Sequence, residues 1–435
     1  MMQNNNHWKQ SLHLEPVKGW LNDPNGLAYF SGKYHIFYQY SYEVDGGLKY
    51  WYYLTSKDLI NYTDKGVFLK PDTEFDSHGA YSGSANIEGD RLAFYYTGNV
   101  KYKGDYDYVH EGRGHNTILF TTKDGIKFSE KEVILKTEEY PNMSNHVRDP
   151  KIFEKNGDSY LILGARDSKD YGCLLVYKNR QYFKTIYSDK NLGYMWECPD
   201  YFNLDGEEIF LFSPQGIANM YPDNKNVYQM GYSIVSEGIE NVEKIKNFKI
   251  LDFGHDFYAS QTFIDENGDR VMYAWAYVPD SAYTNPTTKF GYQNCLTVPR
   301  ILKFKNGQLI QKIHSSVEKL YAEEIKENTF DGKAWYFKQD NGQEFSILVD
   351  RTSISYKEGK LVIEVNENGY GRDNRKFDLD IKDVEIIFDA SSMEIFANGG
   401  SWTFTTRFYP ENHNYKVISN AYLARKINSI NVKGE

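Results

Sequence analysis

Three acidic residues lie close to prolines, in segments rich in turn-forming and aromatic residues. They are Asp23 in WLNDPNG (20–26), Asp149 in RDPK (148–151) and Glu197 in ECPDYF (197–202). Because proline biases the residue before it towards extended backbone, we expect the carboxylates at the starts of strands, pointing into one shared funnel. Such a set suits cleavage of a glycosidic bond, since one carboxylate attacks, a second donates a proton and a third can hold sugar hydroxyls. Taken singly, each acid could equally be a surface or capping residue, and WLNDPNG an ordinary turn.

The elements that would position these carboxylates are short strands. Residues 27–320 hold alternating segments of strand length, bounded by residue pairs that are typical of hairpin turns. The pairs are Asn156-Gly157, Asp205-Gly206 and Asn267-Gly268.

A weak internal repeat divides this part of the chain. SKDLINY (56–62) is echoed by TKDGIKF (122–128), and polar landmark segments begin near residues 22, 82, 148, 197 and 261. Five units of about four short strands each suit a five-bladed β-propeller. We therefore predict an all-β chain with a five-bladed β-propeller over residues 1–315. A stack of β-sandwich domains is the competing interpretation.

The C-terminal quarter of the chain has a different pattern. From about residue 341 apolar and polar residues alternate more cleanly, which predicts a small antiparallel β-sandwich over residues 329–435. The best candidate for a helix, 316–327, lies within the expected connector at 316–328.

Composition excludes several classes of partner. Asp and Glu number 60 against 50 Lys and Arg, for a net charge of −10, and without a basic run this argues against nucleic acid or an anionic membrane. Cys173, Cys198 and Cys295 form no CxxC pair, which favours a reducing compartment and no zinc site.

No signal-peptide pattern and no stretch of about 20 apolar residues is present, so we predict a cytoplasmic location. Aromatic residues, 16% of the chain, suit strands and stacking against sugar rings.

Together these segments resemble glycoside hydrolase family 32, which includes invertases, sucrose-6-phosphate hydrolases, fructanases and some fructosyltransferases. The resemblance runs from about His13 to Pro410. The matching segments are WLNDPNG (20–26), YHIFYQY (34–40), YSGSA (81–85), RDPK (148–151), ECPDYF (197–202), DFYASQTF (256–263), WAY (275–277), NCLTVPR (294–300) and DASSMEIFANGG (389–400).

The resemblance implies a five-bladed propeller followed by a β-sandwich, and a retaining mechanism without metal or organic cofactor. Asp23 matches the nucleophile, Glu197 the acid/base and Asp149 the transition-state stabiliser; the carboxyls of Asp23 and Glu197 would then lie about 5–5.5 Å apart. Other residues match the lining of the fructosyl pocket, with Tyr81 in place of the usual Phe. They are Asn22, Gln39, Tyr81, Ser82 and Arg148, with Trp20 and Trp275 as walls.

Neighbouring residues suggest how the carboxylates are tuned. A guanidinium at Arg148 favours the charged form of the adjacent Asp149, so we expect it to lower the pKa of that carboxyl. Glu197 must carry a proton, which apolar cover from Met195, Trp196 and Pro199 would favour.

The segment 41–54 departs from the family pattern. Gly46-Gly47 stand where a Trp is usual, and Tyr52-Tyr53 where Gly-His is usual. We expect these changes to reshape the leaving-group side of the pocket, so that a phosphorylated or short oligomeric fructoside is preferred over sucrose. The alternative is a surface loop whose changes are neutral. No compact Lys/Arg cluster in the sequence marks a phosphate site.

The favoured function is retaining hydrolysis of terminal β-D-fructofuranosyl units from sucrose, sucrose 6-phosphate or short fructo-oligosaccharides. The expected partner is the small-molecule fructoside, and the sequence predicts no oligomeric state. The alternatives are a fructosyltransferase of the same fold, a catalytically silent sugar-binding propeller and a related five-bladed furanosidase acting on arabinan. Three intact carboxylates count against the silent propeller, and the ECPD segment counts against the arabinan enzyme.

Overall fold

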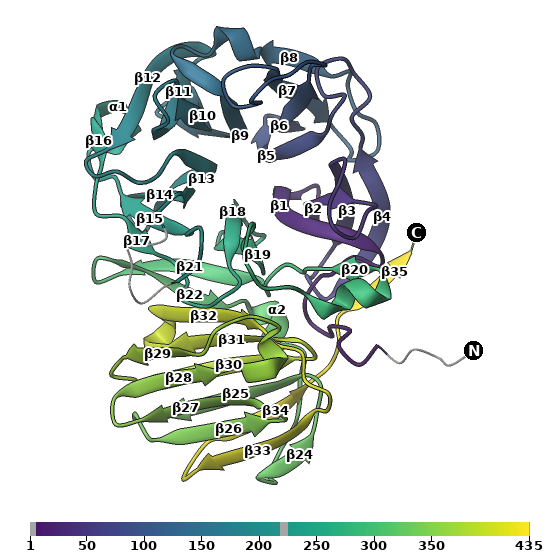
Figure 1. Cartoon of the computed structure of the whole chain (residues 1–435), viewed down its shortest axis with the longest axis vertical. Coiled ribbons are helices and arrows are strands. Elements are labelled where there is room, and N and C mark those ends of the chain that lie inside the picture. The colour runs from purple at the N-terminus through teal and green to yellow at the C-terminus, as the bar shows by residue number, and fades with distance from the viewer. Residues whose placement is uncertain (1–5, 218–224, 435) are drawn as a thin grey trace.

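The computed structural model describes residues 6–217 and 225–434, and nearly all of its regular structure is β-strand. Within these residues the strands form seven sheets. Five sheets follow one another around a ring, and the last two lie as layers beside it (Figure 1). The prediction of an all-β chain is confirmed.

Along the chain, each of the five ring sheets starts with a strand of seven or more residues, which we call its first strand. The strand orders below run across each sheet. The first sheet has the order β20 (Tyr292–Gln293), β1 (Gly19–Phe30), β2 (Lys33–Ser41), β3 (Tyr50–Ser56), β4 (Asn61–Leu69) and β35 (Asn431–Gly434). The second has β5 (Ala80–Glu88), β6 (Arg91–Lys101), β7 (Arg113–Thr122) and β8 (Glu132–Leu135). The third has β16 (Lys244–Ile245), β12 (Gln181–Ser188), β11 (Gly172–Lys178), β10 (Asp158–Asp167) and β9 (Met143–Lys155). The fourth has β13 (Met195–Leu204), β14 (Glu207–Gln215), β15 (Gly231–Ile234) and β17 (Lys249–Ile250), and the fifth has β18 (Tyr258–Ile264), β19 (Arg270–Trp275), β21 (Arg300–Lys305) and β22 (Gln308–Ile313).

Local sequence explains the tight turns between these strands. Asn156-Gly157 and Asp205-Gly206 all have positive φ, the conformation of a type I′ hairpin turn. The weak repeat is a repeated turn: Asp58 Oδ1 accepts the backbone N–H groups two and three residues later, and Asp124 Oδ1 does the same. These predicted turns are confirmed.

The five first strands close the ring. β1 contacts β5, β5 contacts β9, β9 contacts β13, β13 contacts β18, and β18 contacts β1 again. Hydrogen bonds reinforce neighbouring pairs, since Gly83 N donates to Asn25 Oδ1 and Ser84 Oγ donates to the carbonyl of Pro150. The first strands therefore surround one common axis.

Two six-stranded antiparallel sheets follow the ring. One has the order β23 (Tyr321–Glu324), β34 (Leu423–Ile427), β25 (Trp335–Asp340), β30 (Asp383–Asp389), β31 (Ser392–Ala397) and β32 (Trp402–Arg407). The other has β24 (Thr329–Asp331), β33 (Asn414–Ser419), β26 (Phe345–Val349), β27 (Thr352–Lys357), β28 (Lys360–Glu364) and β29 (Arg375–Asp378). Their facing side chains form one apolar core that includes Trp335, Ile347 and Phe388.

The expected helix at 316–327 is wrong in detail. Helix α2 is a single turn, Ser315–Glu318, and residues 321–324 form β23, where Tyr321 stacks on Tyr336 of β25 in the same sheet. The last strand, β35, pairs in parallel with β4 of the ring. The other helical pieces are α1 (Gly238–Asn241) and the 3₁₀ turns Thr137–Glu139, Pro286–Phe290, Asn366–Gly369 and Asn398–Gly400.

None of the helices in the described chain is long and apolar enough to cross a membrane. All three cysteines are buried and unpaired. The expected cytoplasmic location stays a prediction.

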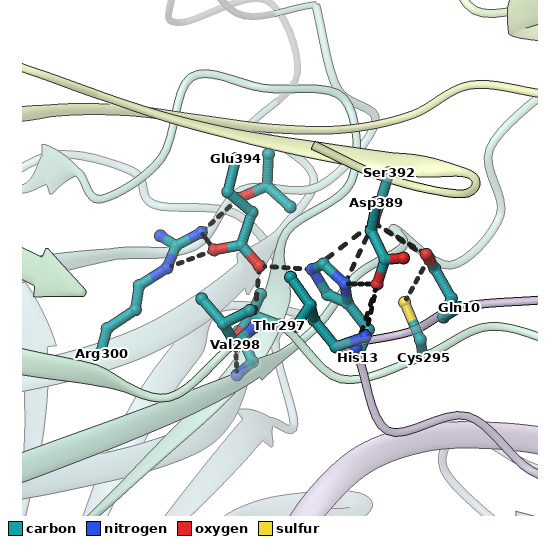
Figure 2. Close-up of polar contacts among 12 residues, drawn as sticks. Gln10, His13, Cys295, Thr297, Val298, Arg300, Asp389, Ser392 and Glu394 are labelled. Carbon is teal, nitrogen blue, oxygen red and sulfur yellow. Dashed lines mark hydrogen bonds and ion pairs between the residues drawn. The ribbon is translucent and has the colours of Figure 1, made fainter. Parts of the chain in front are cut away.

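A buried polar cluster joins the ring to the two-layer unit (Figure 2). His13, ahead of β1, lies between two carboxylates of the second unit, with Nδ1 2.8 Å from Asp389 Oδ2 and Nε2 2.9 Å from Glu394 Oε1. Arg300, at the start of β21, donates to Glu394 Oε2 at 2.9 and 2.6 Å. Burial lowers the pKa of His13, but the hydrogen bonds and charges of the two carboxylates outweigh it and raise the pKa to about 9. The cluster is therefore an ion-pair network with protonated His13 at its centre.

Replacing His13 with Gln should lower the free energy of unfolding by about 3–5 kcal/mol, because it leaves two buried carboxylates without a cation between them. The pKa of His13 in the folded protein, about 9, exceeds the ordinary value of 6.5. The stabilisation is therefore complete below pH 6.5 and is lost as the pH rises through 9.

Urea unfolding at pH 6 and pH 9.5 tests this, with His78→Gln, an exposed histidine, as the matched control. The difference in free energy of unfolding between wild type and His13→Gln should be smaller at pH 9.5 than at pH 6. A gap independent of pH would contradict a charged His13.

Candidate active site

The same irregularity recurs in all five first strands. In each, a step of three residues along the first strand matches a step of two residues along its antiparallel partner. One extra residue is therefore inserted at that point. The extra residue lies within Leu21–Pro24, Ala80–Gly83, Arg148–Lys151, Glu197–Asp200 and Tyr258–Gln261. Such bulges bend a strand and re-aim its side chains. At three of them a non-glycine residue has positive φ: Asp149, Cys198 and Ala259.

These bulges gather the predicted residues around one cavity of about 270 Å³. The ten predicted residues all line it: Trp20, Asn22, Asp23, Gln39, Tyr81, Ser82, Arg148, Asp149, Glu197 and Trp275. The expectation that the carboxylates stand at strand starts is wrong for Asp23 and Asp149, which lie inside β1 and β9. A bulge, rather than a strand end, turns them towards the axis.

A chain of amide and hydroxyl groups holds Asp23. Asn22 Nδ2 donates to Gln39 Oε1 at 2.6 Å and to Asp23 Oδ1 at 3.1 Å. Gln39 Nε2 donates to Ser82 Oγ at 2.6 Å, and Ser82 Oγ donates to Asp23 Oδ2 at 2.5 Å. Trp20 Nε1 fixes the start of the chain by donating to Asn22 Oδ1. Asn22 of β1 and Ser82 of β5 thus each hold one carboxylate oxygen of Asp23, and Gln39 of β2 links the two donors.

Burial raises the pKa values of two carboxyls in the cavity. Burial raises the pKa of Asp23; the hydrogen bond from Ser82 opposes this rise and the charge of Glu197 adds to it. Burial also raises the pKa of Asp149 to about 7, although Arg148 acts in the opposite direction. Arg148 does favour the charged form of Asp149, as expected, but desolvation exceeds this attraction, so the pKa of Asp149 is raised rather than lowered.

Arg148 forms its ion pair with Glu197. Its Nε and Nη2 donate to Glu197 Oε1 at 3.0 and 2.6 Å. Glu197 Oε2 accepts from Gln215 Nε2 at 2.9 Å and from the Tyr258 hydroxyl at 2.7 Å. The expected apolar cover is wrong: Trp196 is buried in the core behind the strand, and the carboxyl of Glu197 contacts polar donors instead.

Asp149 is held from the neighbouring strands. Its backbone N–H donates to Thr97 Oγ1, and its Oδ2 accepts the backbone N–H of Cys198 at 2.9 Å. The Sγ of Cys198 lies 3.8 Å from Asp23 Oδ2 and 3.7 Å from Asp149 Oδ2. Cys198 therefore separates the two aspartates.

The segment 41–54 does not shape the cavity as expected. The hydroxyl of Tyr52 donates to Asp64, and Tyr53 stacks on Phe37 in the core; neither tyrosine is among the described residues that line the cavity. Lys49 is the member of this segment that lines it, and burial lowers the pKa of Lys49 to about 8.

Sequence reasoning missed five lining residues: Lys49, Arg113, Gln215, Tyr258 and Pro279. Only Tyr258 had a signal, because it lies in the segment DFYASQTF (256–263) without an assigned role. In the described chain, no group of three or more His, Cys, Asp or Glu side chains is arranged to hold a metal ion.

Comparison with known proteins places this site in a family. The model "Glycosyl hydrolases family 32 N-terminal domain" matches residues 13–313, and "Glycosyl hydrolases family 32 C terminal" matches residues 324–433. A sucrose-6-phosphate hydrolase of Staphylococcus xylosus is 35% identical, over 94% of this chain and 88% of its own. Another, from Vibrio alginolyticus, is 34% identical over 95% of this chain and 89% of its own.

Solved structures agree with the sequence matches. The structure of sucrose-6-phosphate hydrolase from Lactobacillus gasseri has a TM-score of 0.87 and 28% identity, covering 98% of this chain and 94% of that one. The resemblance inferred from the sequence is confirmed, and the chain belongs to glycosyl hydrolase family 32.

Proposed function

We propose that this glycoside hydrolase releases terminal β-D-fructofuranosyl units from sucrose, sucrose 6-phosphate or short fructo-oligosaccharides, through a covalent fructosyl-enzyme intermediate. The observation that carries the proposal is the pairing of two differently held carboxyls in one cavity. Asp23 is held by neutral donors, whereas Glu197 is held on one oxygen by the guanidinium of Arg148.

Asp23 is the nucleophile. In the first step its carboxylate attacks the anomeric carbon of the fructosyl unit while the bond to the leaving oxygen breaks. Hydrogen bonds from Asn22 and Ser82 fix the orientation of the carboxylate before the substrate binds. Preorganisation of this kind avoids rearrangement during the reaction.

Glu197 is the acid/base, and its proton belongs on Oε2. A guanidinium has only donors, so Oε1 beside Arg148 must remain an acceptor. A tyrosine hydroxyl can donate or accept, and the Tyr258 hydroxyl lies 2.7 Å from Glu197 Oε2 and 3.4 Å from the carbonyl of Ser213. When Oε2 carries the proton, Tyr258 can accept from it and donate to Ser213. In the second step Glu197 removes a proton from the water that hydrolyses the intermediate.

Asp149 and the indoles complete the fructosyl pocket. Asp149 accepts hydrogen bonds from fructosyl hydroxyls and favours the positively charged transition state. The indole N–H of Trp275 is buried without a partner in the described chain, so a sugar hydroxyl would satisfy it. Trp20 meets Trp275 edge to face, with ring centres 5.7 Å apart, and both rings serve as walls.

The proposed architecture is a five-bladed β-propeller that carries the site, followed by a β-sandwich. The closed circuit of five first strands supports five blades, and the two six-stranded sheets with a shared core support the sandwich. Boundaries near residues 315 and 329 agree with the ranges matched by the two family models.

A substrate panel tests the function. Purified protein is incubated with sucrose, sucrose 6-phosphate, 1-kestose and inulin, and released fructose and transfer products are measured at low and high substrate concentrations. We expect fructose release from at least one of the short substrates. Longer products in place of free fructose would indicate a fructosyltransferase, and no turnover of any substrate would contradict the proposal.

Asp23→Asn and Glu197→Gln should each lower kcat/KM by at least about 10²–10⁴-fold, because one loses the nucleophile and the other loses proton transfer. The thermal midpoint should stay near that of wild type. Asp378→Asn, an exposed acid on β29, is the matched control. Substantial turnover by Asp23→Asn, in protein shown free of deamidation, would exclude Asp23 as the nucleophile.

Ser82→Ala should move the acid limb of the pH profile of kcat/KM to higher pH. The attacking carboxylate must be ionised, and the hydrogen bond from Ser82 lowers the pKa of Asp23 against the rise caused by burial. Without that hydrogen bond the pKa of Asp23 rises further, so activity is lost at a higher pH. Ser77→Ala, at an exposed position, should leave the acid limb of the profile at the same pH as in wild type. An unchanged limb in Ser82→Ala would mean that another group controls it.

A further inference from the structure

Three basic side chains line the same cavity as the three carboxylates: Lys49, Arg113 and Arg148. Arg148 binds Glu197, and Lys49 Nζ lies 3.2 Å from Ser41 Oγ. Arg113 differs from both. In the part of the chain that the structure describes, its Nε is buried without a hydrogen-bond partner and no carboxylate pairs with its guanidinium.

Among the described residues, no carboxylate is one of the ionisable groups that shift the pKa of Arg113. Arg113 begins β7 and stands opposite Lys101, the last residue of β6. Burial lowers the pKa of Arg113, the positive charge of Arg148 lowers it as well, and its other ionisable neighbours are Tyr81 and Tyr108. A partly buried guanidinium beside a second cation is unfavourable until an anion binds.

Arg113 lines the cavity near Glu197's partner, Arg148. Arg148 donates to Glu197, the group proposed to protonate the leaving oxygen. The amide and hydroxyl chain that ends at Asp23 is instead proposed to serve the fructosyl unit. This arrangement favours the departing sugar, rather than the fructosyl unit, as the group beside Arg113.

We propose that Arg113 binds a phosphate group on the departing sugar, so that the enzyme prefers phosphorylated fructosides such as sucrose 6-phosphate. The planar guanidinium offers two parallel N–H donors that match two phosphate oxygens. In sucrose 6-phosphate the phosphate is on the glucosyl unit, which leaves when the fructosyl bond is broken. Lys49 adds a second positive charge to the same cavity. This inference rests on the proposed fructosidase function and names its substrate class.

Steady-state kinetics with sucrose 6-phosphate and sucrose test the assignment in wild type, Arg113→Gln, Arg113→Lys and Arg91→Gln. Arg91 is exposed at the opposite end of β6, so its loss removes the same charge away from the cavity. Arg113→Gln should lower kcat/KM for sucrose 6-phosphate about 10- to 100-fold, mainly through KM, because a hydrogen bond between two charged groups is lost. Its kcat/KM for sucrose should fall much less, so that the ratio of the two kcat/KM values changes. Arg113→Lys keeps the charge but not the paired donors, so its kcat/KM for sucrose 6-phosphate should lie between those of wild type and Arg113→Gln.

A binding measurement separates this inference from the proposed function. Glucose 6-phosphate, the departing product, should raise the thermal midpoint of wild type and of Arg91→Gln more than glucose does, and this difference should disappear in Arg113→Gln. Equal losses on both substrates in Arg113→Gln, or an unchanged ratio, would overturn the phosphate assignment while fructose release from sucrose upholds the function. A wild type that releases fructose from neither substrate yet responds to glucose 6-phosphate would overturn the function and leave the phosphate site standing.

Discussion

The active site depends on one backbone constraint, an extra residue in the first strand of each of the five ring sheets. A regular strand turns successive side chains to opposite faces, so it cannot direct two neighbouring residues and a backbone N–H into one central cavity. The inserted residue breaks that alternation where the strands meet around the axis. Positive φ at Asp149 and Cys198 shows that the surrounding sheets hold conformations that these residues rarely adopt alone.

The first ring sheet is tied to the C-terminal unit at two places. β35 returns from the C-terminal unit to pair with β4, and the buried ion-pair network around His13 ties the segment ahead of β1 to β30 and β31. A buried network of this kind gives little net stability. Its directional hydrogen bonds do specify how the two units meet, because any other docking would leave buried charges unpaired.

Charge balance explains how three carboxyls share one small cavity. Three ionised carboxylates would repel one another strongly when desolvated. Arg148 neutralises Glu197, neutral amide and hydroxyl groups hold Asp23, and the pKa of Asp149 rises to about 7. The three carboxyls therefore have different partners, and acid/base catalysis needs groups whose environments differ.

The sequence alone determined the all-β class, the hairpin turns, the family and ten of the residues that line the cavity, because each depends on residues close together in the chain. The landmark segments near residues 22, 82, 148, 197 and 261 were recognisable because prolines and turn-formers accompany the bulges. Partnerships across the cavity depend on distances between strands and on desolvation, and neither has a local sequence signal. Only the tertiary structure could therefore decide that Arg148 donates to Glu197 and that burial outweighs Arg148 in setting the pKa of Asp149. It also decided that Tyr52 and Tyr53 are not among the described residues that line the cavity, whereas Lys49 and Arg113 are.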